Sequence, residues 1–182
     1  MILSEIIAVT TALIYVYFAT KQNRICFLFG FISSAVYIYI TFQSKLYFDS
    51  AISSFYVVMS VVGWINWGKE SIQNTTTHIK AKKLKLTIII GIALCLSLGT
   101  IAIFFTDANL PYFDAFTTVF SVIGTIWLVE KFIENWAVWV VVDVVAAGMY
   151  FYKELYLTSA LFLLYTFIAI KGWIEWNKEF KR

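Results

Sequence analysis

Ionisable and metal-binding side chains are scarce in this 182-residue sequence. Only 14% of the residues are charged, there are two cysteines, Cys26 and Cys95, and the one histidine is His78. No group of His, Cys and carboxylate residues has the spacing of a metal site or of an activated nucleophile. These absences argue against an enzyme, a bound cofactor and a disulfide framework, and they favour reading His78 as a solvated loop residue.

Apolar residues are abundant instead. They make up 61% of the sequence, whose mean hydropathy of +0.81 lies outside the range of soluble globular proteins. A bilayer core takes roughly 20 apolar residues per helix. Charges and turn residues divide the chain into seven candidate spans, near residues 3–20, 25–42, 50–67, 86–105, 112–129, 136–152 and 156–176. The first lacks a basic leader and a cleavage site, so we expect it to be retained.

The stretch 46–70 occurs a second time as 155–179, with 11 of 25 positions identical at a single offset and no gap. Both copies end in Gly-Trp-Ile-x-Trp-x-Lys-Glu. About two or three identities are expected by chance in so apolar a chain, so composition does not explain the match. Internal repeats in membrane proteins are typical of transporters, whose substrate site lies where the repeats meet.

The repeat predicts an arrangement of three, one and three helices. We expect a first three-helix repeat over 1–70, a polar linker and a linker helix over 71–111, and a second three-helix repeat over 112–182. One extra crossing lets the second triplet enter the membrane from the same side as the first, which gives parallel repeats. The sequence therefore predicts an all-α integral membrane protein with seven transmembrane helices.

The basic residues predict the orientation of the spans. Of the 14 Lys and Arg residues, 12 fall on one side and only Lys45 and Lys153 on the other. Because cytoplasmic loops retain positive charge, we expect the N-terminus outside and the C-terminus inside. These anchors also account for the net charge of +3 without a nucleic-acid partner.

Asp143 lies near the middle of the sixth span. Helical spacing puts it on one stripe with Trp136, Trp139, Ala147 and Tyr150. A carboxylate facing lipid there costs roughly 3 kcal/mol, so we expect it to face the bundle interior. It is either a structural acid bonded to a neighbouring helix or a ligand for the transported molecule.

Polar seams on neighbouring spans favour the second interpretation. The fifth span carries Asp114, Thr117, Ser121 and Thr125 on one side, and Tyr56 and Tyr165 are repeat-related residues near mid-membrane. Small hydroxyl residues often only allow close helix packing, but several seams together are better explained by a shared polar path. A Trp face beside a carboxylate suits a cationic aromatic group. We therefore expect Trp139, Asp143, Tyr56, Tyr165, Asp114, Thr117 and Ser121 to bind a small polar, cationic aromatic solute.

Tryptophans gather near the predicted inner ends of the spans. Most fit an interfacial belt, but repeat-related pairs also suit a gate. We expect the inner gate to be formed by Asn135, Trp64, Trp67, Trp173 and Trp176.

Several motifs together resemble those of the PnuC vitamin transporters. They are the runs 113–118 (Phe-Asp-Ala-Phe-Thr-Thr), 134–139 (Glu-Asn-Trp-Ala-Val-Trp) followed by Asp143, 152–158 and 172–176, with 23–26 and 46–49 in the first half. The resemblance covers essentially the whole chain.

The resemblance implies a fold like that of the SWEET sugar transporters and facilitated uptake across the bacterial inner membrane. It implies nicotinamide riboside as substrate, with thiamine or riboflavin as alternatives, and a cytosolic kinase that traps the substrate by phosphorylation. No cofactor is implied, and a homo-oligomer is compatible with the sequence. A seven-helix receptor is the alternative from another class, but a retinal protein needs a mid-helix lysine, and Lys171 lies near the end of its span.

Overall fold

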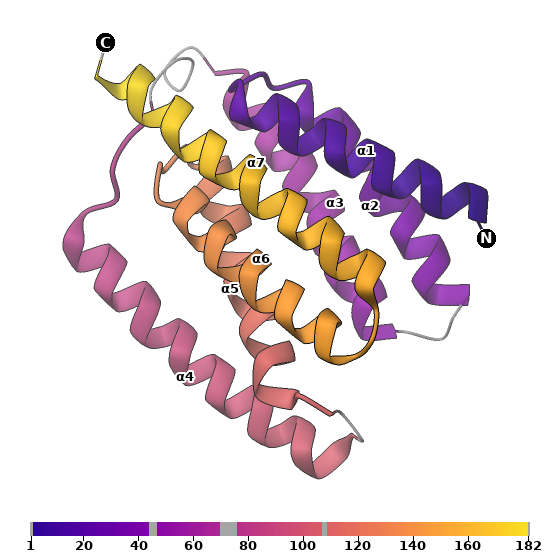
Figure 1. The fold of residues 1–182 in the computed structure, drawn as a ribbon. Coiled ribbons are helices and arrows are strands. Elements are labelled where there is room, and N and C mark those ends of the chain that lie inside the picture. The colour runs from indigo at the N-terminus through magenta and orange to yellow at the C-terminus, as the bar shows by residue number, and fades with distance from the viewer. Residues whose placement is uncertain (1, 44–46, 70–75, 107–108, 182) are drawn as a thin grey trace. The chain divides into compact units, whose positions relative to one another are not determined.

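The structure is a computed structural model that describes residues 2–43, 47–69, 76–106 and 109–181. In these ranges seven α-helices are each long and apolar enough to cross a membrane (Figure 1). The predicted all-α fold with seven spans is therefore confirmed. Lys45, Leu46 and Glu70, which the sequence analysis used, lie outside the described residues.

The first compact unit, Met1–Thr75, contains α1 (Ile2–Thr20), α2 (Cys26–Gln43) and α3 (Tyr47–Trp67). The second, Thr76–Arg182, contains α4 (Ala81–Phe105), α5 (Pro111–Val129), α6 (Asn135–Tyr152) and α7 (Tyr156–Phe180). In each unit every helix packs on the one that follows it in sequence, so α2 lies between α1 and α3, and α6 between α5 and α7.

Two helices extend four or five residues beyond a predicted end. The helix α4 begins at Ala81, five residues before the expected start, because the lysine-rich segment that follows is helical. Long unbranched side chains such as lysine favour the helix, and charge alone was a poor guide to the boundary. The helix α7 continues to Phe180, because the charged residues in its last turns also favour the helix.

The three helices of the first unit correspond one to one with the last three helices of the second. The same offset that relates the two copies of the sequence repeat also relates the first residues of α1 and α5, of α2 and α6, and of α3 and α7. The turns between the first two helices of each triplet match as well. Gln22 and Lys131, again at this offset, both have left-handed backbones, with φ of 52° and 57°.

In each triplet an aromatic ring of the second helix packs on a glycine of the third helix, at positions related by the repeat. Phe27 of α2 meets Trp67 of α3 edge-on at 4.8 Å, and its ring lies against Gly63. In the second unit Trp136 meets Trp176 edge-on at 5.5 Å, and its ring lies 2.6 Å from where a Cβ on Gly172 would be. Both glycines are therefore needed for the close approach of the helices.

Apolar side chains face outward on the helices, as a lipid environment requires. On α4 the exposed residues include Ile89, Leu96, Phe104 and Phe105. Buried hydroxyls are bonded between helices, since Ser33 donates to the Ala8 carbonyl at 2.9 Å and Ser159 donates to the Ala147 carbonyl at 2.8 Å. This is the arrangement of polar residues expected inside a membrane bundle.

Candidate functional site

The strongest candidate residue, Asp143, is a buried acid on the middle helix of the second unit. Its side chain is 4% exposed, and among the described residues it has no hydrogen-bond or ion-pair partner. A buried carboxylate is costly unless it is paired. The hydrogen bond to a neighbouring helix that a purely structural acid would make is therefore not seen in the described part of the chain.

The direction of Asp143 follows from the contacts on either side of it along α6. Trp136 packs on Gly172, the Ala147 carbonyl accepts from Ser159, and Tyr150 stacks on Phe162 with ring centroids 5.2 Å apart. All three contacts are with α7. Asp143 comes seven residues after Trp136 and four before Ala147, so it lies on the same stripe. Its carboxylate is therefore on the α7 side of α6.

Trp139 lies at the edge of this stripe, and its indole reaches toward α5. Its indole Nε1 is 3.1 Å from the position of a Cβ on Gly124. The absence of a side chain at Gly124 therefore provides the space in which the half-buried indole lies. Trp139 and Asp143 thus occupy the part of α6 between its contacts with α5 and α7. Gly124 was missed by the sequence analysis, although it is the one glycine within the polar seam.

The polar seam of α5 borders this region. Cys95, Gly91 and Gly99 of α4 contact the opposite side of α5, so Thr117 and Ser121 lie on the flank turned away from α4. The Thr117 hydroxyl donates to the carbonyls of Phe113 at 3.1 Å and Asp114 at 3.0 Å. A hydroxyl that donates to its own helix still has lone pairs with which it can accept a hydrogen bond from a ligand.

Asp114 is not brought together with Trp139. It lies in the first turn of α5, ten residues before Gly124, which is about 15 Å along a helix. There its Oδ1 lies 3.4 Å from Nζ of Lys153, in the turn after α6. Both side chains are partly exposed, at 44% and 28% respectively. The contacts favour an ion pair at the end of the helix hairpin.

The two repeat-related tyrosines lie in different units. The ring centroids of Tyr165 and Phe162 lie 6.0 Å apart. Phe162 also stacks on Tyr150, which belongs to the α6 stripe. Tyr56 contacts Phe55, and its carbonyl accepts from Ser60 at 2.8 Å. That the two tyrosines bind one solute stays a prediction.

The predicted gate residues fall into two groups. Trp67 is 2% exposed and Trp176 fully buried, and each forms an aromatic contact inside its own unit. Trp64 is 38% exposed and lies under the Arg24 guanidinium at 4.7 Å, while Trp173 is half-buried. Burial favours a packing role for the first pair and leaves the second available for a gate.

Asn135, the remaining gate candidate, is the first residue of α6 and is completely buried. Its Nδ2 donates to the Phe132 carbonyl at 2.6 Å, whereas its Oδ1 has no partner among the described residues. The neighbouring Trp136 Nε1 is likewise buried and without a described partner. The start of α6 therefore presents an unused acceptor and an unused donor side by side in sequence.

His78 is not simply a solvated loop residue. Although its side chain remains 44% exposed, its Nδ1 lies 2.8 Å from Oε1 of Glu134, and its ring meets Phe180 edge-on at 4.7 Å. The sequence offered no signal for this contact, because His78 and Glu134 are 56 residues apart.

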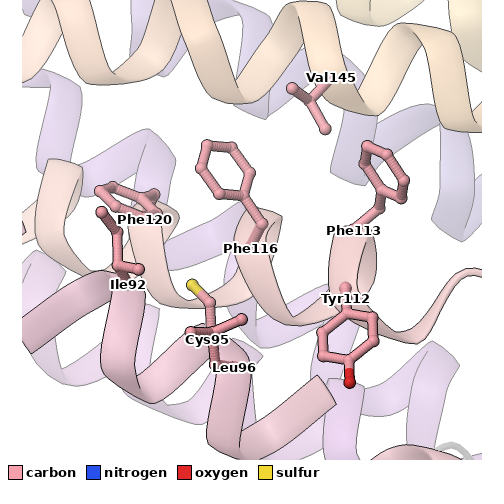
Figure 2. Close-up of a pocket in the computed structure, with 8 residues that line it drawn as sticks. All are labelled: Ile92, Cys95, Leu96, Tyr112, Phe113, Phe116, Phe120 and Val145. Atoms are coloured by element: carbon pink, nitrogen blue, oxygen red, sulfur yellow. The ribbon is translucent and has the colours of Figure 1, made fainter. Parts of the chain in front are cut away.

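A cleft of about 350 Å³ lies between α4, α5 and α6 (Figure 2). Its lining is almost wholly apolar: Ile92, Cys95, Leu96, Tyr112, Phe113, Phe116, Phe120 and Val145. Figure 2 shows the phenylalanine rings between Val145 and the α4 residues. The one hydroxyl in the lining, on Tyr112, lies 3.3 Å from Thr100 Oγ1. The cleft contains none of the predicted binding residues, and its lining has no carboxylate to neutralise a cationic solute.

A family model, curated relatives and a solved structure all match this chain over nearly its whole length. The sequence model of the family described as nicotinamide mononucleotide transporter matches residues 2–178. The nicotinamide riboside transporter PnuC of Escherichia coli (strain K12) is 23% identical over 96% of this chain and 86% of its own length. Its counterpart in Neisseria mucosa is 26% identical over 97% of this chain and 72% of its own length. A crystal structure of the vitamin B3 transporter PnuC superposes with a TM-score of 0.74 at 23% identity, covering 97% of this chain and 81% of the other.

Proposed function

Because the chain belongs to the nicotinamide mononucleotide transporter family, we propose that it takes up nicotinamide riboside by facilitated diffusion across a bacterial inner membrane. Family membership makes it a multi-pass membrane transporter and not an enzyme. The relatives at 23% and 26% identity are named for nicotinamide riboside. The seven apolar helices are in accord with that assignment.

The charge of the candidate residues favours the riboside over the mononucleotide. The predicted binding residues include two carboxylates, Asp143 and Asp114, and no lysine or arginine. A phosphate group needs cationic or N–H donors, and a buried carboxylate without a partner repels it. The same carboxylate attracts the positively charged pyridinium ring of the riboside. An unphosphorylated cation is therefore the ligand that these side chains favour.

The observation that carries the proposal is the burial of Asp143 without a partner among the described residues, one helical turn after Trp139 on α6. In the proposed binding mode, Trp139 lies against the cationic ring, a contact worth about 2 kcal/mol when the cation is desolvated. Asp143 neutralises the charge of the ring. Thr117, Ser121, Tyr56 and Tyr165 supply hydrogen bonds to the ribose hydroxyls, and Asp114 remains a candidate at the outer end.

The proposed transport mechanism is alternating access between two parallel three-helix repeats joined by α4. The repeats comprise residues 1–70 and 112–182, with the linker and linker helix over 71–111. The constant offset between the helix starts of the two triplets supports this division. With the N-terminus outside, we place the inner gate at Asn135, Trp64 and Trp173, next to Trp67 and Trp176, which burial assigns to packing inside their own units. A cytosolic kinase then traps the riboside as its phosphate.

Ligand binding by the purified protein tests the proposal. Isothermal calorimetry and thermal shift in detergent compare nicotinamide riboside with thiamine, riboflavin and nicotinamide mononucleotide, since a bound ligand raises apparent stability by mass action. Uptake of labelled ligand into proteoliposomes then separates transport from binding. Preference for the riboside supports the proposal, and preference for thiamine moves the substrate within the same family. Binding of none of these ligands contradicts it.

A further inference from the structure

Residues 76–80, which we call the strap, run beside the turn that joins α5 to α6. The Thr77 N–H donates to the Lys131 carbonyl at 3.2 Å, and the Ile133 N–H donates to the Thr77 carbonyl at 3.0 Å. These two bonds form a short parallel bridge between Thr77 and Phe132. A segment that precedes α4 is thereby bonded through its backbone to a turn that follows α5, two helices further along the chain.

The side chain of Glu134 makes a second set of contacts with the strap. Its Oε2 accepts from the Ile79 N–H at 3.0 Å, and its Oε1 lies 2.8 Å from Nδ1 of His78. Ile79 is 6% exposed, and the Glu134 side chain 18%. Because both carboxylate oxygens bind the strap, Glu134 holds the turn rather than a transported solute.

The position of Glu134 gives these bonds their importance. It immediately precedes Asn135, the first residue of α6, and the same helix carries Trp139 and Asp143. The side chains of the α6 stripe project from one helix axis, so a small rotation of α6 about that axis moves all of them together. Fixing the residue before α6 therefore limits the rotation of the helix that presents the predicted binding side chains.

The matching turn of the first unit has the same internal hydrogen bonds without the glutamate. Gln22 N–H donates to the Ala19 carbonyl at 3.0 Å, as Lys131 N–H donates to the Leu128 carbonyl at 3.0 Å. At the position that the repeat pairs with Glu134, the first unit has Ile25, which is 41% exposed. The turn thus forms without a carboxylate, and the glutamate serves something other than the formation of the turn.

We propose that the strap is a positioning element for α6, in which Thr77, His78 and Ile79 hold Glu134 and its turn and so fix the orientation of Trp139 and Asp143. His78 and Glu134 are positioning residues that do not touch the solute. The strap remains bonded throughout the transport cycle. The expected effect on ligand affinity rests on the proposed function, whereas the effect on the order of α6 does not.

Two variants of Glu134 separate positioning from general folding. Glu134→Ala removes both acceptors, and we expect ligand affinity to fall about tenfold, by roughly 1.4 kcal/mol. Glu134→Gln keeps an acceptor for the Ile79 N–H and a partner for neutral His78, so it restores most of the affinity. Lys83→Ala is the matched control, because it removes the ion pair with the exposed Glu130 at 2.8 Å and the contact of Lys83 Nζ with the Phe132 ring at 4.6 Å, while the backbone bridge and the bonds of Glu134 keep their partners.

A disulfide provides the decisive rescue. Thr77→Cys with Phe132→Cys places two cysteines on the bridged pair, within the Cα separation that a disulfide spans. In the Glu134→Ala background we expect oxidation to restore affinity and reduction to remove it again. With Glu134 present, the oxidised protein transports normally. Single-cysteine variants check that the buried Cys26 and Cys95 take no part.

Hydrogen exchange supplies a readout that needs no ligand. We expect the amides of Ile79 and Ile133 to exchange slowly in the unaltered protein, because both donate hydrogen bonds. We expect Glu134→Ala to speed exchange over residues 131–138 while the rest of α6 and α7 stays protected. Unchanged exchange, unchanged affinity in Glu134→Ala, failure of the disulfide to rescue, or a block of transport by the disulfide would each overturn the strap proposal. If the unaltered protein binds no vitamin, the proposed function fails, and the exchange experiment still decides the strap.

Discussion

The two triplets share one scaffold but reverse a contact at its centre. In the first unit Gly30 of the middle helix receives the ring of Tyr15 from α1, whose Cδ2 lies 2.9 Å from the position of an added Cβ. In the second unit the corresponding residues are Trp139 and Gly124, and the ring belongs to the middle helix. The large and small residues have exchanged places across the same helix pair.

The reversal separates what the duplication keeps from what it changes. The aromatic and glycine contacts at one end, Phe27 on Gly63 and Trp136 on Gly172, are kept. Four residues beyond the reversed contact, the first unit has Ser34 where the second has Asp143. A ring on the middle helix next to a carboxylate is therefore a property of the second unit alone. We interpret the kept contacts as folding requirements and the changed ones as the basis of ligand binding.

Removing the charge of Asp143 gives the largest expected effect on binding. Asp143→Asn is nearly isosteric but cannot neutralise a cation, and the attraction of two opposite charges about 4 Å apart is roughly 4 kcal/mol at an effective dielectric constant of about 20, before the cost of desolvation. We expect affinity for a cationic vitamin to fall about 10- to 100-fold in calorimetry.

Ser34→Ala is the matched control, because Ser34 is buried at the equivalent place in the first unit. It leaves affinity within about twofold of the unaltered protein, which is close to the error of such measurements. Equal losses in the two variants would show that the two units share the binding role, which contradicts its assignment to the second unit.

Filling the glycine of a kept contact is expected to destabilise the fold. In Gly172→Ala the new methyl meets the Trp136 ring at 2.6 Å, and overpacking of this kind costs about 1–3 kcal/mol. The measurement is unfolding in detergent. Gly63→Ala, facing Phe27, has a loss of similar size if the two contacts serve the same purpose.

Gly148→Ala is the control for this pair. Nothing lies within 4 Å of a Cβ added at Gly148 in the structure, so stability stays the same or rises by about 0.5–1 kcal/mol from the better helix propensity of alanine. Loss of stability in all three variants would mean that membrane glycines matter here for a reason other than ring contact.

Substitution at the reversed contact distinguishes the units through function. In Gly124→Ala the new methyl lies 3.1 Å from the Trp139 Nε1, so the indole shifts slightly and affinity falls a few-fold, about 1 kcal/mol or less. Gly30→Ala displaces Tyr15 instead and changes stability more than affinity. Calorimetry and unfolding on both variants measure the two effects, and the reverse pattern would place the binding surface in the first unit.

The number of spans and the repeat could be predicted from the sequence, because they depend on the composition of each segment and on the spacing of matching residues. Seven spans, and a repeat offset that also relates the helix starts, follow from local patterns that survive in each helix. The contacts of His78 with Glu134 and of Gly124 with Trp139 could not be predicted. In each contact the two residues are far apart in sequence, and their distance in space depends on how the helices are rotated about their axes. The spacing of apolar residues along the sequence does not determine that rotation.

Asp114 provides the smallest expected effect and tests how far the binding region of the second unit extends. Its carboxylate and Lys153 are partly exposed and 3.4 Å apart, and such pairs contribute about 0–1 kcal/mol. If Asp114 is only an ion-pair partner, Asp114→Asn and Lys153→Ala lower the unfolding free energy equally and leave affinity unchanged. If it also binds the cation, Asp114→Asn weakens binding while Lys153→Ala strengthens it, because the freed carboxylate then serves the ligand alone. Calorimetry on the two variants decides between these outcomes, and the distance along α5 favours the first.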